Sequence, residues 1–164
     1  DQTCALPIYR VSRDGKIGFI RSSDGSVVTP ASIDRVWELS EGLAAFAVNY
    51  TPNQSRFRYY DHKVDMRNNR GLDDGDFGYV NEDGEIVIPA VFSCAYEFSE
   101  GLAVVRFGDF FTGKRGYINT NGELVISPAF NYAYSFEDGV ACVIVNERPG
   151  YIDRTGEFVF GPSL

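Results

Sequence analysis

Histidine is almost absent from this sequence, since His62 is the only one among 164 residues. A serine or cysteine nucleophile activated by an imidazole would have to use His62, and no G-x-S-x-G turn is present to hold the serine. C-x-x-C pairs, H-E-x-x-H and phosphate-binding glycine motifs are missing as well. We therefore expect a protein that is not an enzyme and that needs no cofactor and no metal.

Cysteine and long apolar runs are also scarce. Cys4, Cys94 and Cys142 allow at most one disulfide within the chain, with either partner open to Cys4, and we expect Cys94 and Cys142 to pack as small core residues. No run approaches the roughly 18–20 apolar residues of a membrane-spanning helix. The first residues, DQTCALP, contain neither Met nor an apolar targeting segment. We expect a mature exported protein, periplasmic or secreted, with the cytoplasm as the alternative.

Positive charge is in deficit, because 15 Lys and Arg stand against 23 Asp and Glu, a net charge of -8. This balance opposes attraction to phosphate backbones and anionic lipids, so we expect no nucleic-acid partner. Abundant aromatics, 13 Phe and 10 Tyr, together with 17 Gly favour a protein rich in strands and turns.

Internal repetition is what the sequence has in abundance. A first phrase, in which Gly-aromatic-aliphatic leads into a glycine turn and an aliphatic run before Pro, occurs four times: GFIRSSDGSVVTP, GYVNEDGEIVIP, GYINTNGELVISP and GYIDRTGEFVFGP. A second phrase occurs three times between these copies, as VWELSEG, AYEFSEG and AYSFEDG. Such periodicity is typical of stacked supersecondary units that bury their faces only against one another.

Each first phrase is predicted to form a hairpin. Asp24-Gly25, Asp83-Gly84 and Asn121-Gly122 tolerate the positive φ angles of tight hairpin turns, and Thr155-Gly156 takes the same place in the fourth copy. Proline lacks the N–H that a strand ladder uses, so we expect strands to end at the prolines. These are Pro30, Pro89, Pro128 and Pro162.

The sequence thus predicts an all-β fold in one domain, 1–164. Four three-stranded antiparallel units, at about 8–30, 43–89, 102–128 and 140–162, are expected to stack as a short curved array, with a closed propeller-like ring as the alternative. Equivalent second-phrase residues are expected to pack between the units: Trp37, Tyr96 and Tyr134, and Leu39, Phe98 and Phe136.

The two phrases in this order, carried by GYVNEDGEIVIP, EFSEGLAVV and GYINTNGELVISP, resemble the WG β-repeat family. The resemblance covers nearly the whole chain apart from residues 50–76, although Ile17, Phe77, Arg115 and Pro149 replace the tryptophan before the phrase glycine. It implies a bacterial repeat protein, commonly exported, without established catalytic chemistry, and some members look like immunity partners of secreted toxins. The hairpins also look like those of choline-binding repeats, whose aromatics hold a quaternary ammonium.

Residues 50–76 break the spacing of the repeat, because Gly42 and Gly78 lie about 36 residues apart whereas Gly101 and Gly116 lie about 15 apart. Long insertions in compact domains are often functional, and Arg and Tyr dominate interface hot spots. Asp73-Asp74-Gly75-Asp76 offers oxygen ligands for Ca²⁺ but lacks the rest of an EF-hand loop. An idle or self-pairing hairpin is the alternative. The predicted partner-binding residues are Arg56, Phe57, Arg58, Tyr59, Tyr60, His62 and Arg67.

These patterns favour a non-enzymatic module that binds a protein partner. An acidic scaffold suits a basic toxin or enzyme, as expected of an immunity or inhibitor protein. The alternative is an envelope module that binds a small ligand or glycan through aromatics between hairpins. A hydrolase built on paired carboxylates such as Glu85, Glu123 and Glu157 ranks third, because a hairpin end is the ordinary place for these residues.

Overall fold

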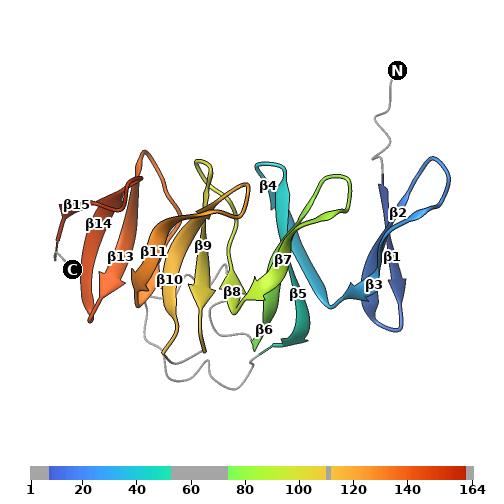
Figure 1. The fold of residues 1–164 in the computed structure, drawn as a ribbon, viewed down its shortest axis with the longest axis horizontal. Helices are drawn as coiled ribbons and strands as arrows, with labels where there is room; N and C mark the ends of the chain where they lie inside the picture. The colour runs from blue at the N-terminus through green and yellow to red at the C-terminus, as the bar shows by residue number, and fades with distance from the viewer. Residues whose placement is uncertain (1–7, 53–73, 110–111, 162–164) are drawn as a thin grey trace.

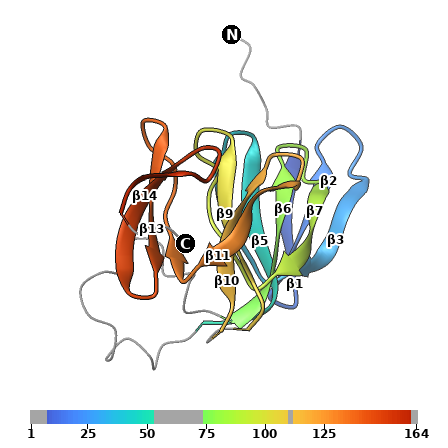
Figure 2. The ribbon, with the colours of Figure 1, turned by 60° about the vertical axis from the view of Figure 1, so that its left-hand side comes forward.

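The computed structural model describes residues 8–52, 74–109 and 112–161, and the regular structure in them is entirely β. Four antiparallel sheets follow one another in chain order, with sheet one and sheet four at opposite ends of the row (Figure 1). Turned views show the same row of facing sheets (Figure 2). The fold is therefore an open β-repeat array, as predicted, rather than the closed ring.

The sheets have the following strands, and within each sheet neighbouring strands are consecutive in sequence. Sheet one contains β1 (Ile8–Arg13), β2 (Lys16–Arg21) and β3 (Val27–Ile33). Sheet two contains β4 (Arg35–Ser40), β5 (Leu43–Thr51), β6 (Asp74–Asn81) and β7 (Ile86–Phe92). Sheet three contains β8 (Cys94–Ala95), β9 (Leu102–Phe107), β10 (Lys114–Asn119) and β11 (Leu124–Phe130). Sheet four contains β12 (Tyr132–Ala133), β13 (Val140–Val145), β14 (Arg148–Asp153) and β15 (Phe158–Phe160).

Sheets two to four contain one strand more than predicted, because the second phrase forms β4, β8 and β12. Each of these strands pairs antiparallel with the strand that follows it. The connecting turn is tight, since Glu100 and Gly101 both have positive φ (54° and 79°), as a two-residue hairpin requires. The sequence predicted such a two-residue turn at Asp83-Gly84. There, only Gly84 has a positive φ.

The first-phrase turn is instead a three-residue loop held by one side chain. Asn81 Oδ1 accepts hydrogen bonds from the backbone N–H groups of Asp83 (3.0 Å) and Glu85 (2.9 Å), and the Gly84 N–H donates to the Asn81 carbonyl (3.1 Å). Asn119 and Asp153 accept the equivalent bonds in sheets three and four.

The prolines do not end their strands as predicted. β7 continues through Pro89 to Phe92, and β3 and β11 likewise run through Pro30 and Pro128, while Pro162 lies outside the described residues. Tyr79 pairs with Ile88 and Phe77 with Phe92, so β7 bulges out between these pairs. β7 is an edge strand, where a bulge tolerates a residue without an N–H.

These bulges explain the glycine that begins each first phrase. A Cβ on Gly78 would lie 2.4 Å from the Ile88 carbonyl oxygen, and one on Gly116 would lie 2.5 Å from that of Ile126. The φ angles of these glycines are ordinary, so the requirement is for space. The bulged outer strand closes onto the glycine and leaves no room for a side chain.

Aromatic pairs join sheet two to sheet three and sheet three to sheet four. The buried Tyr79 ring lies 4.9 Å from the Phe98 ring, and its hydroxyl donates to the Tyr96 carbonyl (2.8 Å). Tyr117 makes the same contacts with Phe136 (5.0 Å) and with the Tyr134 carbonyl (2.8 Å). We call these two arrangements the aromatic clasps, and they confirm the predicted core positions of Phe98 and Phe136.

Leu39 does not pack between units as predicted, since 49% of it is exposed. Sheet one has Phe19 where sheets two and three have tyrosine, and the cluster around Phe19 is completed by Ala44, Phe46 and Val80 of sheet two. The contact between sheets one and two therefore forms without an aromatic clasp.

The Ser-Glu-Gly end of the second phrase also links neighbouring sheets. Ser40 Oγ donates to the Phe98 carbonyl and Ser99 Oγ to the Phe136 carbonyl, each at 2.7 Å. Glu41 Oε2 accepts a hydrogen bond from the Gly101 N–H at 2.9 Å. Each of the first two copies of the second phrase is therefore hydrogen-bonded to the next copy, which gives a structural reason for its repetition.

Candidate functional site

The predicted binding residues in the insertion cannot be placed in a site. Arg56, Phe57, Arg58, Tyr59, Tyr60, His62 and Arg67 lie outside the described residues, as do Cys4 and Asp73. The candidate surface described below is therefore built from residues 8–52, 74–109 and 112–161.

Seven turns collect at one end of the array. Strands alternate in direction, and each of sheets two to four has four strands, so the turns at 22–26, 41–42, 82–85, 99–101, 120–123, 137–139 and 153–157 all lie along the upper edge in Figure 1. Arg154 is the only basic residue in these turns. Their carboxylates are Asp24, Glu41, Glu82, Asp83, Glu85, Glu100, Glu123, Glu137, Asp138, Asp153 and Glu157. We call this set the acidic rim.

Several carboxylates of the rim are fixed by hydrogen bonds. Glu123 Oε2 accepts from Asn119 Nδ2 (2.7 Å), and Glu85 accepts from Asn81 (3.1 Å), so the repeated glutamate closes its own hairpin end. The Thr155 hydroxyl and N–H hold the pKa of Asp153 below its usual value, and the Ser26 N–H has the same effect on the pKa of Asp24. Asp24 and Asp153 therefore keep their negative charge at neutral pH.

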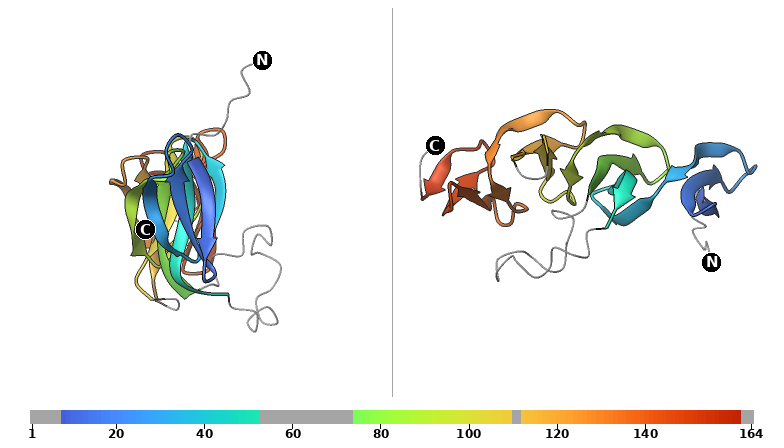
Figure 3. Two further views of the ribbon diagram at one scale, coloured as in Figure 1. Left: turned by 90° about the vertical axis from the view of Figure 1, so that its right-hand side faces the viewer. Right: turned by 90° about the horizontal axis from the view of Figure 1, so that it is seen from below.

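A row of exposed aliphatic side chains borders the rim. Each lies two or three residues after a turn glycine on an outer strand, which is the last strand of its sheet (β3, β7, β11 or β15). Between 44% and 63% of each residue is exposed. Figure 3 shows the outer strands following one another along one side of the array. The members are Val27, Ile86, Val87, Leu124, Val125 and Val159. We call them the outer row.

A second irregularity in the outer strands explains this exposure. Val80 pairs with Ile86 and Tyr79 with Ile88, which leaves Val87 as an extra residue in a bulge. Val125 is the extra residue in the same way in β11. Sequence reasoning missed the row because regular alternation buries one residue of every adjacent pair, whereas a bulge lets both members reach the edge.

The opposite end of the sheets carries most of the cations. Lys16 Nζ contacts Asp34 Oδ1 at 2.5 Å, and the Tyr50 N–H donates to Asp34 Oδ2 at 3.2 Å. Burial disfavours the Asp34 charge, but these hydrogen bonds outweigh it and hold the pKa of Asp34 below its usual value. The described cations at this end are Arg13, Lys16, Arg35, Arg106, Lys114, Arg115 and Arg148. The array is therefore polarised along its strands, negative at the rim.

Aromatic side chains gather where the insertion leaves sheet two. The Trp37 ring lies 5.8 Å from Tyr50 and 5.5 Å from Phe77. The Arg35 guanidinium lies 5.0 Å from the Trp37 ring and 5.6 Å from the Tyr50 ring, and it donates to the Tyr50 hydroxyl (3.0 Å). The aromatic faces that a quaternary ammonium would use are thus contacted by the chain's own cation.

Two arginines on neighbouring strands of sheet three are buried. Arg106 Nε donates to the Ser93 hydroxyl (3.0 Å), and burial lowers the pKa of Arg106. Arg115 donates to the Asn131 carbonyl and lies 4.8 Å from the Tyr132 ring. Arg115 occupies the position just before the phrase glycine, which is the tryptophan position in the WG repeat. Its guanidinium contacts an aromatic ring of sheet four.

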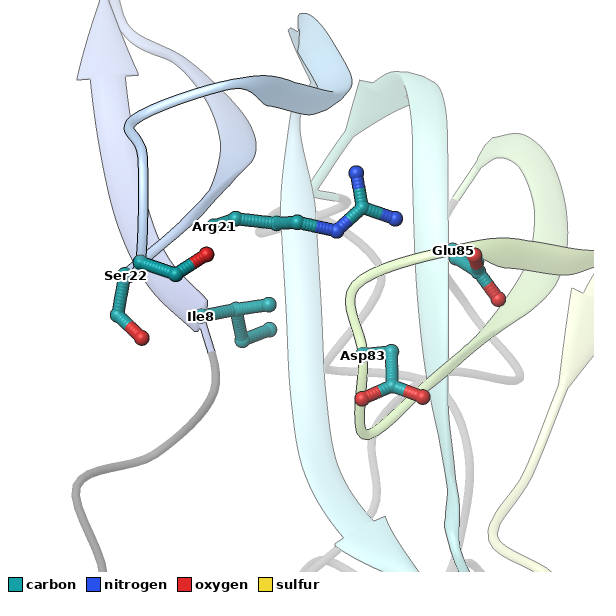
Figure 4. A pocket seen from close by; sticks show the side chains of 6 residues that line it. Ile8, Arg21, Ser22, Asp83 and Glu85 are labelled. Carbon is teal, nitrogen blue, oxygen red and sulfur yellow. The ribbon is translucent and has the colours of Figure 1, made fainter.

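A shallow cleft opens between sheets one and two beside the rim. Figure 4 shows Arg21 and Ile8 of sheet one pointing toward the sheet-two turn that carries Asp83 and Glu85. Ser22 and Ser23 complete the lining. The cleft combines charges of both signs with hydroxyls and extends the polar rim.

Metal and membrane motifs are not found in the described part of the chain. Residues 8–52, 74–109 and 112–161 contain no group of three His, Cys, Asp or Glu side chains that could hold a metal ion. Across the same residues no helix is long and apolar enough to span a bilayer. Cys94 is buried, as predicted for a core residue, whereas Cys142 is only half-buried.

Comparison with curated proteins finds no match. A family model described as WG containing repeat matches residues 17–51, 77–109 and 116–148, which together make up more than half of the chain. Each match begins in the strand with the Gly-aromatic pair and ends in or just after the second strand of the next sheet. The chain therefore belongs to the WG β-repeat family.

Proposed function

We propose that this WG-repeat chain is a non-enzymatic interaction module that binds a basic protein partner through the acidic rim and the outer row. One observation carries the proposal: on each of the four sheets, an exposed aliphatic residue lies within two residues of the end of a turn that bears carboxylates. The two surfaces therefore run side by side along the whole array.

Such a combination suits protein recognition. Protein interfaces pair an apolar centre, which loses water on binding, with a polar border. The outer row supplies apolar side chains, and the rim supplies a negative field that speeds encounter with a positive surface and discourages acidic partners. The turns of sheets two to four are already held by hydrogen bonds to Asn81, Asn119 and Asp153, so binding needs little further ordering of them.

A basic toxin or enzyme fits this surface, with the chain acting as its immunity or inhibitor protein in the periplasm or outside the cell. Covering a cationic substrate-binding surface would inactivate the partner without any chemistry by the inhibitor. The insertion residues 56–67 form a second proposed contact region, which is to be tested separately.

Capture of the partner from an extract of the native host tests the rim and row. The double variant Val87→Glu/Val125→Glu is expected to capture at most about one tenth as much partner as the parent chain, because two charges would be buried in the interface in place of apolar contacts. Val91→Glu is the matched control, since Val91 is 66% exposed on β7 but lies away from the rim, and it should capture like the parent chain. Equal capture by the double variant would overturn the proposal.

The insertion requires its own comparison. Replacing Arg56, Arg58, Tyr59 and Tyr60 with alanine should weaken capture while leaving the melting temperature nearly unchanged. Unchanged capture would remove the insertion from the interface without affecting the case for the row.

A further inference from the structure

The face that sheet four turns away from sheet three has the composition of an internal interface. Tyr151 takes the place of Tyr79 and Tyr117, and Phe160 that of Ile88 and Ile126, by position in the repeat and in the strand register. The internal residues are at most 6% exposed, whereas Tyr151 is 44% and Phe160 72% exposed.

Further apolar side chains continue this surface, which we call the tail face. Cys142 pairs with Tyr151 across the sheet and therefore shares its face, together with Val140 and Ile144 of the same strand. All three are half-buried. The tail face thus combines two exposed aromatics with three partly covered aliphatic or thiol side chains.

The outward side of sheet one, the head face, corresponds to surfaces that are buried elsewhere. Val11 and Ile20 take the places of Phe46 and Val80, which are 1% and 2% exposed against sheet one. Val11 and Ile20 are only half-buried. The turn at Gly25 is also uncovered, because a Cβ on Gly25 would have no atom within 4 Å, whereas one on Gly84, Gly122 or Gly156 would contact the preceding sheet.

We propose that the head face of one copy packs on the tail face of a second copy. Each internal interface joins the tail-directed side of one sheet to the head-directed side of the next, and the proposed contact repeats this arrangement between molecules. Because the two surfaces differ, the contact is heterologous and can propagate into chains of molecules. This proposal does not depend on the proposed function, which uses a different side of the array.

One residue limits the strength of the contact. Tyr9 stands where sheets two, three and four have Ala44, Ala103 and Ala141, so a second copy cannot approach as closely at that point as neighbouring sheets do. Tyr9 is 58% exposed. Association is therefore weaker than packing within the array and increases with protein concentration.

Sedimentation velocity over a concentration series tests the proposal with three variants of the full chain. Val11→Glu blocks the head face and Phe160→Glu blocks the tail face, so each variant alone should remain monomeric where the parent chain associates. A mixture of the two should form a dimer and nothing longer, because one intact head then meets one intact tail. Val91→Glu, on an unrelated surface, should associate like the parent chain.

A fourth variant tests the geometry. Tyr9→Ala restores the residue found in the other sheets and should lower the apparent dissociation constant several-fold. The proposal is overturned if the parent chain stays monomeric throughout, if the mixture fails to form a dimer, or if Val11→Glu still associates while Phe160→Glu does not, which would indicate tail-to-tail contact. Circular dichroism of each variant excludes loss of folding as the cause.

Discussion

Two kinds of glycine occur in the array, and they are required for different physical reasons. Gly78 and Gly116 have ordinary backbone angles but no room for a Cβ, because the carbonyl of a bulged strand lies 2.4–2.5 Å away. Gly15 has open space around it but a φ of 77°, which an L-residue rarely adopts. A side chain at Gly78 or Gly116 would clash with the backbone of the neighbouring strand, whereas a side chain at Gly15 would strain only the backbone of residue 15 itself.

Gly78→Ala is accordingly expected to destabilise the fold by about 2–4 kcal/mol, as overpacking against backbone does. Gly15→Ala is the matched comparison and should cost about 1–2 kcal/mol through its backbone angle. Urea denaturation followed by circular dichroism gives both values. Equal costs at the two positions would contradict the assignment of Gly78 to lack of space.

Tyr117 should make the fold sensitive to alkaline pH. Burial raises the pKa of its phenol well above the usual value of 10.0, so the folded state keeps the proton when the unfolded chain loses it. The contribution of this phenol to the free energy of unfolding is fully present below pH 10. It then falls by about 1.4 kcal/mol per pH unit as the pH rises. Tyr117→Phe should lower stability at pH 8 by about 1–2 kcal/mol, because the Tyr134 carbonyl loses its donor, yet flatten the alkaline slope. A slope unchanged in this variant would show that other groups control the alkaline loss.

At the scale of the element, a single side chain holds each first-phrase turn in sheets two to four. Asn119 accepts two backbone N–H groups and donates to Glu123, while sheet four achieves the same backbone bonds with Asp153. The chain therefore contains its own natural substitution at this position.

Asn119→Ala is expected to cost about 1–2 kcal/mol, since two turn N–H groups lose their acceptor, and Asn119→Asp should cost less at pH 7. The pH dependence separates the carboxylate-held turn of sheet four from the amide-held ones. The pKa of Asp153 is lowered in the folded state, so its contribution is present above about pH 4 and is lost as pH falls through the folded pKa. Thermal melts at pH 7 and pH 3 measure the stability of each variant. A larger loss of stability for Asn119→Asp than for Asn119→Ala at pH 7 would count against the role of this side chain in the turn.

The elements also show which structural features could be predicted from sequence. The third unit was predicted to begin at residue 102, and its first full strand, Leu102–Phe107, begins there because an apolar run follows a glycine-containing turn. β8 and β12 were missed because each is only two residues long, too short for a periodicity to show. The bulges around Pro89 and Val87 were missed because they are properties of the pairing with β6 and not of β7 alone.

At the scale of the whole molecule, the acidic rim depends on strand number. Four strands return the chain to its starting end, so every sheet from sheet two onward begins in the same direction and its acidic turns meet on one edge. The three-stranded units predicted from sequence would have reversed direction from one unit to the next. The acidic turns were visible in the sequence, but their convergence into one surface was not.

The rim predicts a salt-dependent encounter with a basic partner. Raising ionic strength shortens the Debye length, from about 10 Å at 0.1 M to about 3 Å at 1 M, so the association rate should fall steeply while the dissociation rate changes little. Surface plasmon resonance at several salt concentrations measures both rates. A dissociation rate that carries most of the salt dependence would place the carboxylates inside the interface instead of along its border.

The missing aromatic clasp between sheets one and two determines how the array comes apart. Sheets two to four are joined by buried tyrosine–phenylalanine pairs with hydroxyl-to-carbonyl bonds, but Phe19 has no hydroxyl and Leu39 stays exposed. Amide hydrogens of β1–β3 should therefore exchange with solvent before those of β9 and β13, which mass spectrometry can resolve. Slower exchange in β1–β3 than in β13 would refute this order. Fraying thus begins at the N-terminal sheet, and a pulling force on the array would open that seam first.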